Sequence, residues 1–224
     1  GHNERRYGTP WTAPPGPRMR EYIQCVQAIF KTFQNPKQPT FFEGTHYKYT
    51  MAPPVFTAEP IEHPHVPIHL AAVNPYMSRL GGELCDGVFA HPACTAKYIR
   101  EAMLPQIAKG AHKAGRSMAE VEIIGAPIIV TGNNKEELAQ ERQLLKRRVA
   151  FYGSTRTYHP IFEVHGCGDL GRKLHALSVE NRWDDMVKQI PDAMAEEFAT
   201  VGYLDEIGAK LKERWGDLLT TLNL

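Results

Sequence analysis

The sequence contains few cysteines, and none is placed to form a structural site. Four occur in 224 residues, far apart along the chain and without a CxxC pair: Cys25, Cys85, Cys94 and Cys167. A disulfide framework or a zinc site needs cysteines and histidines at short, recurring spacings. The ten histidines follow no HExxH pattern. We therefore expect free thiols and no metal site.

Long apolar runs and an excess of basic residues are also missing. No run reaches the roughly 20 apolar residues that cross a bilayer, and the first residues do not follow a signal-peptide pattern. Lys and Arg number 26 against 25 Asp and Glu, a net charge of +1. Binding to nucleic acid or to a membrane surface needs a basic footprint. The sequence therefore predicts a cytoplasmic protein with no nucleic-acid and no membrane partner.

A GxGxxG turn is absent after every apolar run, which disfavours a Rossmann fold. Short apolar runs instead alternate with helical patterns, which is typical of a parallel α/β sheet. Four of these runs are predicted strands: 66–73, 87–91, 121–131 and 217–224. The first is almost wholly apolar, so we expect both of its faces to be covered.

The number of strands bears on the fold class. A complete (β/α)₈ barrel has eight strands, and this chain supplies about four. We predict one domain over residues 1–224, of the TIM-barrel type but present as an incomplete barrel; an open doubly wound sheet is the alternative. Half a barrel leaves two strand edges unpaired. We therefore expect a homo-oligomer, most simply a dimer that completes the sheet.

Other segments have their own signatures. Residues 19–33 carry an apolar stripe at helical spacing, preceded by a proline suited to a first helical turn. An arm is predicted over 1–17 and a hairpin over 41–50. Residues 154–182 have little pattern and are predicted to be an insertion, acting as a lid or an oligomer contact. Further helices are predicted at 75–84, 95–114 with a kink at Pro105, 134–152, 183–200 and 204–215.

The turn after the first predicted strand is a candidate ligand site. Its sequence is Ala71-Ala72-Val73-Asn74-Pro75. The first N–H groups of the following helix lack partners, and with the positive end of the helix dipole they attract anions. Asn74 tolerates left-handed geometry, and Pro75 is expected to start the helix. Every strand-to-helix unit has such a turn, so this feature alone favours a structural role.

The amino-acid sequence of this region resembles that of a known family. AAVNPYMSRLGGELCDG, residues 71–87, resembles the A-A-x-G-P-x-x-x-x-L-A-G-E-x-A-D-G stretch of the luciferase-like monooxygenases. FEGTHY, residues 42–47, is similar to the F-x-G-x-H-Y hairpin of that family. LPQIAKGAHKAGR and VTGNNKEEL resemble later segments in the correct order. The resemblance extends from about residue 4 to residue 224 and is closest to the deazaflavin F-420 branch.

The resemblance implies an oxidoreductase or monooxygenase that uses F-420 or FMN on a small-molecule substrate. It implies that the coenzyme phosphate end meets Ala72, Val73, Asn74, Pro75, Tyr76 and Met77. Asn74 stands where the family usually has glycine, so its side chain could crowd a phosphate. Glu83 and Asp86 are expected to orient the turn and the next strand. The family's first four strands do not match any part of this chain, so the catalytic residues are unknown.

The sequence also offers other candidate side chains and one alternative function. His91 ends the second predicted strand, where a ligand contact or a packing role is expected, and His69 is expected to be a core histidine. Phe151 and Tyr152 are expected to pack on their helix. The alternative function is a truncated, non-catalytic half-barrel that folds as a homo-oligomer without coenzyme.

Overall fold

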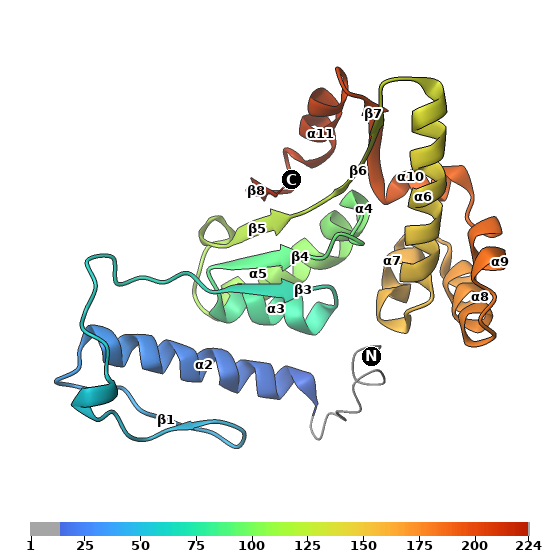
Figure 1. The fold of residues 1–224 in the computed structure, drawn as a ribbon. Helices are drawn as coiled ribbons and strands as arrows, with labels where there is room; N and C mark the ends of the chain where they lie inside the picture. The colour runs from blue at the N-terminus through green and yellow to red at the C-terminus, as the bar shows by residue number, and fades with distance from the viewer. Residues whose placement is uncertain (1–13, 224) are drawn as a thin grey trace.

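The computed structural model describes residues 14–223, which are organised around a parallel β-sheet (Figure 1). Its four strands follow the order β3 (His69–Ala72), β4 (Gly87–Ala90), β5 (Glu122–Gly125) and β8 (Thr221–Leu222). All neighbouring strands are parallel. Each of the four predicted ranges thus contains one strand of this sheet, in the predicted order, and each of these strands is shorter than predicted. The described residues form an incomplete barrel and no closed one.

Asp86, immediately before β4, fixes the register of three strands. Its backbone N–H donates to the Ile68 carbonyl at 2.9 Å, and its carboxylate accepts the Ile68 N–H at 2.7 Å. Its carbonyl accepts the Glu122 N–H at 2.9 Å. The carboxyl ends of the strands therefore lie at the same position along the sheet, with Ala72 beside Ala90.

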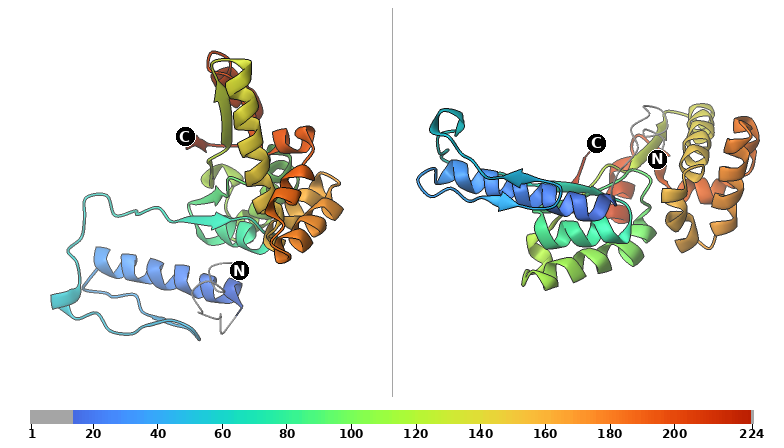
Figure 2. Two further views of the ribbon diagram at one scale, coloured as in Figure 1. Left: turned by 45° about the vertical axis from the view of Figure 1, so that its right-hand side comes forward. Right: turned by 90° about the horizontal axis from the view of Figure 1, so that it is seen from below.

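Within residues 14–223, helices cover only one face of this sheet. Leu70 and Ala72 are buried on the face that α3 (Pro75–Leu84) and α5 (Leu104–Lys113) cover (Figure 2). His69 and Ala71 alternate onto the other face and are exposed. The prediction of a strand covered on both faces is therefore wrong for the described residues. His69 is not a core residue either, because its side chain is 33% exposed and lies 3.2 Å from the Glu122 carboxylate.

The packing of α3 against α5 depends on two glycines that let the helix backbones touch. A Cβ atom on Gly110 would lie 1.9 Å from the Arg79 carbonyl oxygen. One on Gly82 would lie 2.1 Å from the Ile107 carbonyl oxygen. Both distances are far inside van der Waals contact, so only glycine fits at these positions.

The predicted strand 121–131 is two strands in two sheets. Pro127 interrupts it, because proline has no N–H to donate to a neighbouring strand. After the break, β6 (Ile128–Gly132) pairs in parallel with β7 (Ala199–Tyr203). The predicted helix 183–200 is replaced by α9 (Trp183–Lys188), α10 (Asp192–Glu197) and then β7. Pro191 separates the two helices, and the sequence Ala-Thr-Val favours a strand after them.

The segment 154–182 is helical rather than unpatterned. It follows α6 (Lys135–Gly153) and contains the short turn η4 (Arg156–Tyr158), α7 (His159–Val164) and α8 (Gly168–Val179). Ile161, Phe162 and Leu174 are fully buried. Figure 1 shows these helices beyond the carboxyl ends of β3 and β4. None of the helices in residues 14–223 is long and apolar enough to cross a membrane.

The predicted helix 95–114 contains an irregular turn directly before Pro105. It comprises α4 (Ala96–Tyr98), a π-helical turn (η2, Ile99–Met103) and α5, which contains Pro105 near its start. The wider turn accommodates the residue that lacks an N–H. The last helix, α11 (Ile207–Trp215), lies within the predicted range 204–215.

The N-terminal elements pack on α3. Helix α2 (Pro15–Gln34) and the antiparallel pair β1 (Phe42–Glu43) and β2 (Lys48–Tyr49) confirm the predicted helix and hairpin. Glu83 on α3 accepts from Arg20 on α2 at 2.6 Å and from Lys113 on α5 at 2.9 Å. The hydrogen bonds from Arg20 lower the pKa of Glu83 to about 2. Most of the predicted arm 1–17 lies outside the described residues.

Substitution at Gly110 tests the contact between α3 and α5. Gly110→Ala is expected to lower the free energy of unfolding by about 2–3 kcal/mol, because the methyl group forces the helices apart. Gly208→Ala in α11 is the control, since a Cβ atom at that position would have no neighbour within 4 Å. That change is expected to be neutral or stabilising by up to about 1 kcal/mol. Urea unfolding that gives equal stabilities for both variants would contradict the account.

Candidate functional site

The turn after β3 brings the six predicted turn residues together at the carboxyl edge of the sheet. Asn74 is the residue before α3, and Pro75 opens the helix. The backbone of Asn74 is extended, with φ −94° and ψ 161°, as is usual for a residue before proline, so its tolerance of left-handed geometry is not used here. The side chain of Ala72 faces the helix layer and is buried. A ligand at this turn would therefore meet backbone more than side chains.

At the start of α3, two backbone donors have no acceptor within residues 14–223. Pro75 has no N–H, and the Ser78 N–H donates to the Asn74 carbonyl at 3.1 Å. The N–H groups of Tyr76 and Met77 lie between them and have no helical acceptor. The Asn74 side chain makes no capping bond to them. Within residues 14–223, these two donors at the positive end of the helix dipole have no recorded acceptor, an arrangement that suits an anion.

The side chain of Asn74 points to a distant part of the chain. Its amide Nδ2 donates to the Thr157 carbonyl at 3.2 Å. Thr157 lies in η4, which thus rests against the turn after β3. The side chain that was expected to crowd a phosphate is directed to this contact instead.

His91 lies one residue beyond β4 and also meets η4. Its ring stacks on Tyr158 with centroids 4.9 Å apart, and its Nε2 lies 3.3 Å from the Tyr158 hydroxyl. Nδ1 accepts the Ala93 N–H at 3.1 Å. Tyr152 packs edge-on against the same ring. Burial lowers the pKa of His91, so the ring is neutral at neutral pH.

Tyr98 stabilises the turn through a hydrogen bond to its backbone. Its hydroxyl donates to the Val73 carbonyl at 3.0 Å, and the side chain is buried. Burial raises the pKa of Tyr98 to about 12, so the hydroxyl keeps its proton and remains a donor. This bond fixes the carbonyl directly before Asn74.

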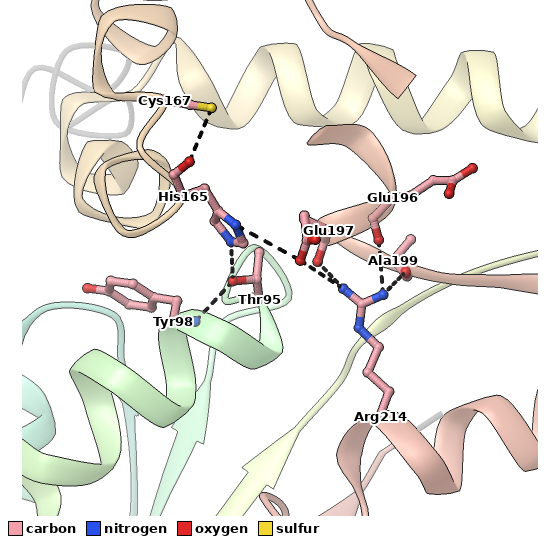
Figure 3. Close-up of polar contacts among 8 residues, drawn as sticks. All are labelled: Thr95, Tyr98, His165, Cys167, Glu196, Glu197, Ala199 and Arg214. Atoms are coloured by element: carbon pink, nitrogen blue, oxygen red, sulfur yellow. Dashed lines mark hydrogen bonds and ion pairs between the residues drawn. The ribbon is translucent and has the colours of Figure 1, made fainter. Parts of the chain in front are cut away.

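A second polar cluster joins α7 to the start of α4 (Figure 3). Thr95 caps α4 by accepting the Tyr98 N–H at 3.1 Å, and its hydroxyl lies 2.8 Å from His165 Nε2. Figure 3 shows His165 between Thr95 and Glu197, whose carboxylate is 3.9 Å from Nδ1. Burial lowers the pKa of His165. Arg214 completes the cluster by donating to the carbonyls of the α10–β7 connection.

The sequence did not identify Thr157, Tyr158 or His165 as residues near this site. All three belong to 154–182, which lacks the periodicity that would have placed it. For Tyr152, packing on its helix was favoured over closing on a substrate, and its ring contacts His91. The pairing of an asparagine with a carbonyl 83 residues away has no local sequence signal.

A cavity lies at the opposite edge of the sheet. It has a volume of about 670 Å³ and lies between α2 and the amino ends of β3 and β4. Its lining includes Phe30, Lys31, Val66, Cys85 and Arg116. Burial raises the pKa of Cys85 to about 12, so this thiol is protonated and unreactive. No group of three metal-binding side chains occurs in the part of the chain that the structure describes.

The buried histidines predict a pH dependence of stability. Because burial lowers the pKa of His91, the unfolded chain binds a proton at a higher pH than the folded chain does. Stability is therefore full above about pH 6.5 and falls as the pH drops through the folded pKa. His91→Phe keeps a stacking ring and removes this titration. Urea unfolding at neutral and acidic pH should give a smaller loss for the variant; equal losses would contradict the assignment.

Comparisons with known proteins agree with the fold. Residues 1–221 match the model of the luciferase-like monooxygenase family. An uncharacterized protein of Mycobacterium tuberculosis is 35% identical over 213 residues, which are 95% of this chain and 62% of that protein. The F420-dependent glucose-6-phosphate dehydrogenase of Beutenbergia cavernae is 29% identical over 126 residues, 54% of this chain and 34% of that enzyme.

Among solved structures, the coenzyme F420 dependent tetrahydromethanopterin reductase from Methanopyrus kandleri is similar with a TM-score of 0.75 and 21% identity. The match covers 98% of this chain and 63% of the reductase. The chain thus spans about three fifths of the length of the Mycobacterium protein and of the reductase. At this identity the structural likeness concerns the fold, while the family match covers almost the whole chain. The chain belongs to the luciferase-like monooxygenase family.

Proposed function

We propose that this chain binds a phosphate-bearing coenzyme, deazaflavin F420 or FMN, with its phosphate end at the 72–77 turn. The observation that carries the proposal is the pair of N–H donors of Tyr76 and Met77 at the carboxyl edge of the sheet, which have no acceptor among the described residues. In parallel α/β folds, ligands bind at this edge. Membership of a family of coenzyme-dependent oxidoreductases supports the same position.

The residues present fit a phosphate group. Two N–H donors and the helix dipole favour a negative charge. Ala71 is small and exposed on the open face of the sheet, so it leaves room for a ligand. The amide of Asn74 is turned toward Thr157 and does not fill the space in front of the donors.

The coenzyme would carry the redox chemistry. When bound, a reduced coenzyme of this kind supplies the hydride, and the protein binds and orients it. The 72–77 turn would anchor the phosphate end, and His91 would border the site with a neutral ring. Relatives that are named as F420-dependent enzymes favour the deazaflavin as the coenzyme. The deazaflavin in turn favours hydride transfer over monooxygenation. We further propose a small-molecule substrate in a cytoplasmic setting.

A second candidate is a non-catalytic homo-oligomer. In the described residues, β3 and β8 each have one strand neighbour, so the sheet has two open edges. Exposed strand edges favour pairing with another chain. Two copies joined edge to edge would bring together eight parallel strands. If this candidate is correct, the protein forms a dimer that binds neither F420 nor FMN.

Coenzyme titration of variants at Tyr76 tests the first proposal. Tyr76→Glu adds a carboxylate to the first turn of α3, and Tyr76→Gln is the uncharged control. We expect the Glu variant to bind F420 about tenfold more weakly than the Gln variant, because two charges about 4 Å apart repel by about 1–4 kcal/mol. Both variants lose the same ring contacts with α2 and the same hydrogen bond to Arg20. Because a carboxylate at this position can also pair with Arg20, the same comparison in an Arg20→Gln background separates that ion pair from repulsion of the phosphate.

Fluorescence titration and light scattering together decide between the candidates. Saturable binding by the unmodified chain, weakened by the Glu variant, supports the coenzyme site. Equal affinities of the Glu and Gln variants would move the phosphate away from this turn. A dimer without any coenzyme binding would support the non-catalytic homo-oligomer.

A further inference from the structure

Asn74 occupies a capping position without capping its helix. An asparagine before a helix ordinarily accepts a hydrogen bond from the second or third helical N–H. Here the side-chain amide donates to the Thr157 carbonyl, and no bond to its own helix forms. The same choice leaves the N–H groups of Tyr76 and Met77 open. One side chain therefore links the turn to η4 and spares the donors.

Two further contacts hold the same segment at the edge of the sheet. The His91 ring stacks on Tyr158, directly after Thr157. His165, at the end of α7, bonds the Thr95 hydroxyl. Together with the Asn74 bond, these contacts attach residues 157–165 to the residues that follow β3 and β4. We call residues 157–165 the cover segment.

The Asn74 contact differs from the other two in its position. His91 and His165 are partly or largely buried and join packed elements, so they stabilise the fold. The Asn74 amide lies at the surface, where a hydrogen bond contributes little to global stability. Its effect is local, because it joins the 72–77 turn directly to the cover segment.

We infer that Asn74 is a positioning residue that holds the cover segment against the coenzyme turn. The inference rests on the proposed function, since it assigns the turn to the coenzyme. It adds a specific role for the residue that departs from the family's glycine. A contact between two segments means that ordering one of them helps to order the other. The affinity of the 72–77 turn for its ligand therefore depends on whether the cover segment is in place.

Hydrogen–deuterium exchange tests the contact without any ligand. Asn74→Ala removes the amide and, because Asn74 does not cap α3, loses no helix cap. We expect amides of the cover segment to exchange about fivefold faster, while those of α3 keep their rates. Asn133→Ala is the matched control, because the Asn133 amide bonds Glu137 at the start of its own helix, away from the cover segment. The control should leave exchange in 157–165 unchanged.

A second arm measures F420 binding by the same proteins. Asn74→Ala is expected to weaken binding about fivefold, and the Asn133 control to leave it unchanged. Unchanged exchange in the cover segment of Asn74→Ala would overturn the positioning role, as would tighter binding by that variant. If the unmodified chain binds no F420 or FMN, the proposed function fails. Exchange then still decides whether Asn74 holds the segment.

Discussion

The hydrogen bonds of Asp86 are the constraint on which the site depends. One residue pairs with β3 through its N–H and its carboxylate, and with β5 through its carbonyl. These bonds align the amino ends of three strands. Since the strands have four residues each, they also end level. The turn after β3 and His91 after β4 consequently lie side by side at one edge.

Helices α2, α3 and α5 stabilise the position of this edge. The close contact at Gly82 and Gly110 lets α3 and α5 share one face of the sheet. Glu83 joins both helices to α2 through Arg20 and Lys113. The start of α3 is thereby fixed in direction. The opposite face of the sheet carries His69 and Ala71 and has no helix over it in residues 14–223.

The sequence predicted what depends on local pattern. The four strands of the main sheet, α2, the hairpin and the 72–77 turn follow from short apolar runs, helical spacing and turn residues. It missed β7, whose three strand-forming residues directly follow a helical pattern. It also missed the helices of 154–182, which are buried through long-range packing of Ile161, Phe162 and Leu174.

The candidate site divides in the same way. The turn residues and His91 were predicted because each directly follows an apolar run. Their partners Thr157 and Tyr158 were not, because only folding brings them to the sheet. The extended backbone of Asn74 is a local effect, because a residue before proline favours that conformation. The bond of its side chain to Thr157 has no local sequence signal.

The central claim is that the start of α3 receives the phosphate end of the coenzyme. Amide chemical shifts, followed by NMR as FMN or F420 is added, test it most directly. The account predicts that the amide signals of Tyr76 and Met77 shift most, because their N–H groups gain an acceptor. Largest shifts around the cavity beside α2, at Lys31 and Arg116, would contradict it.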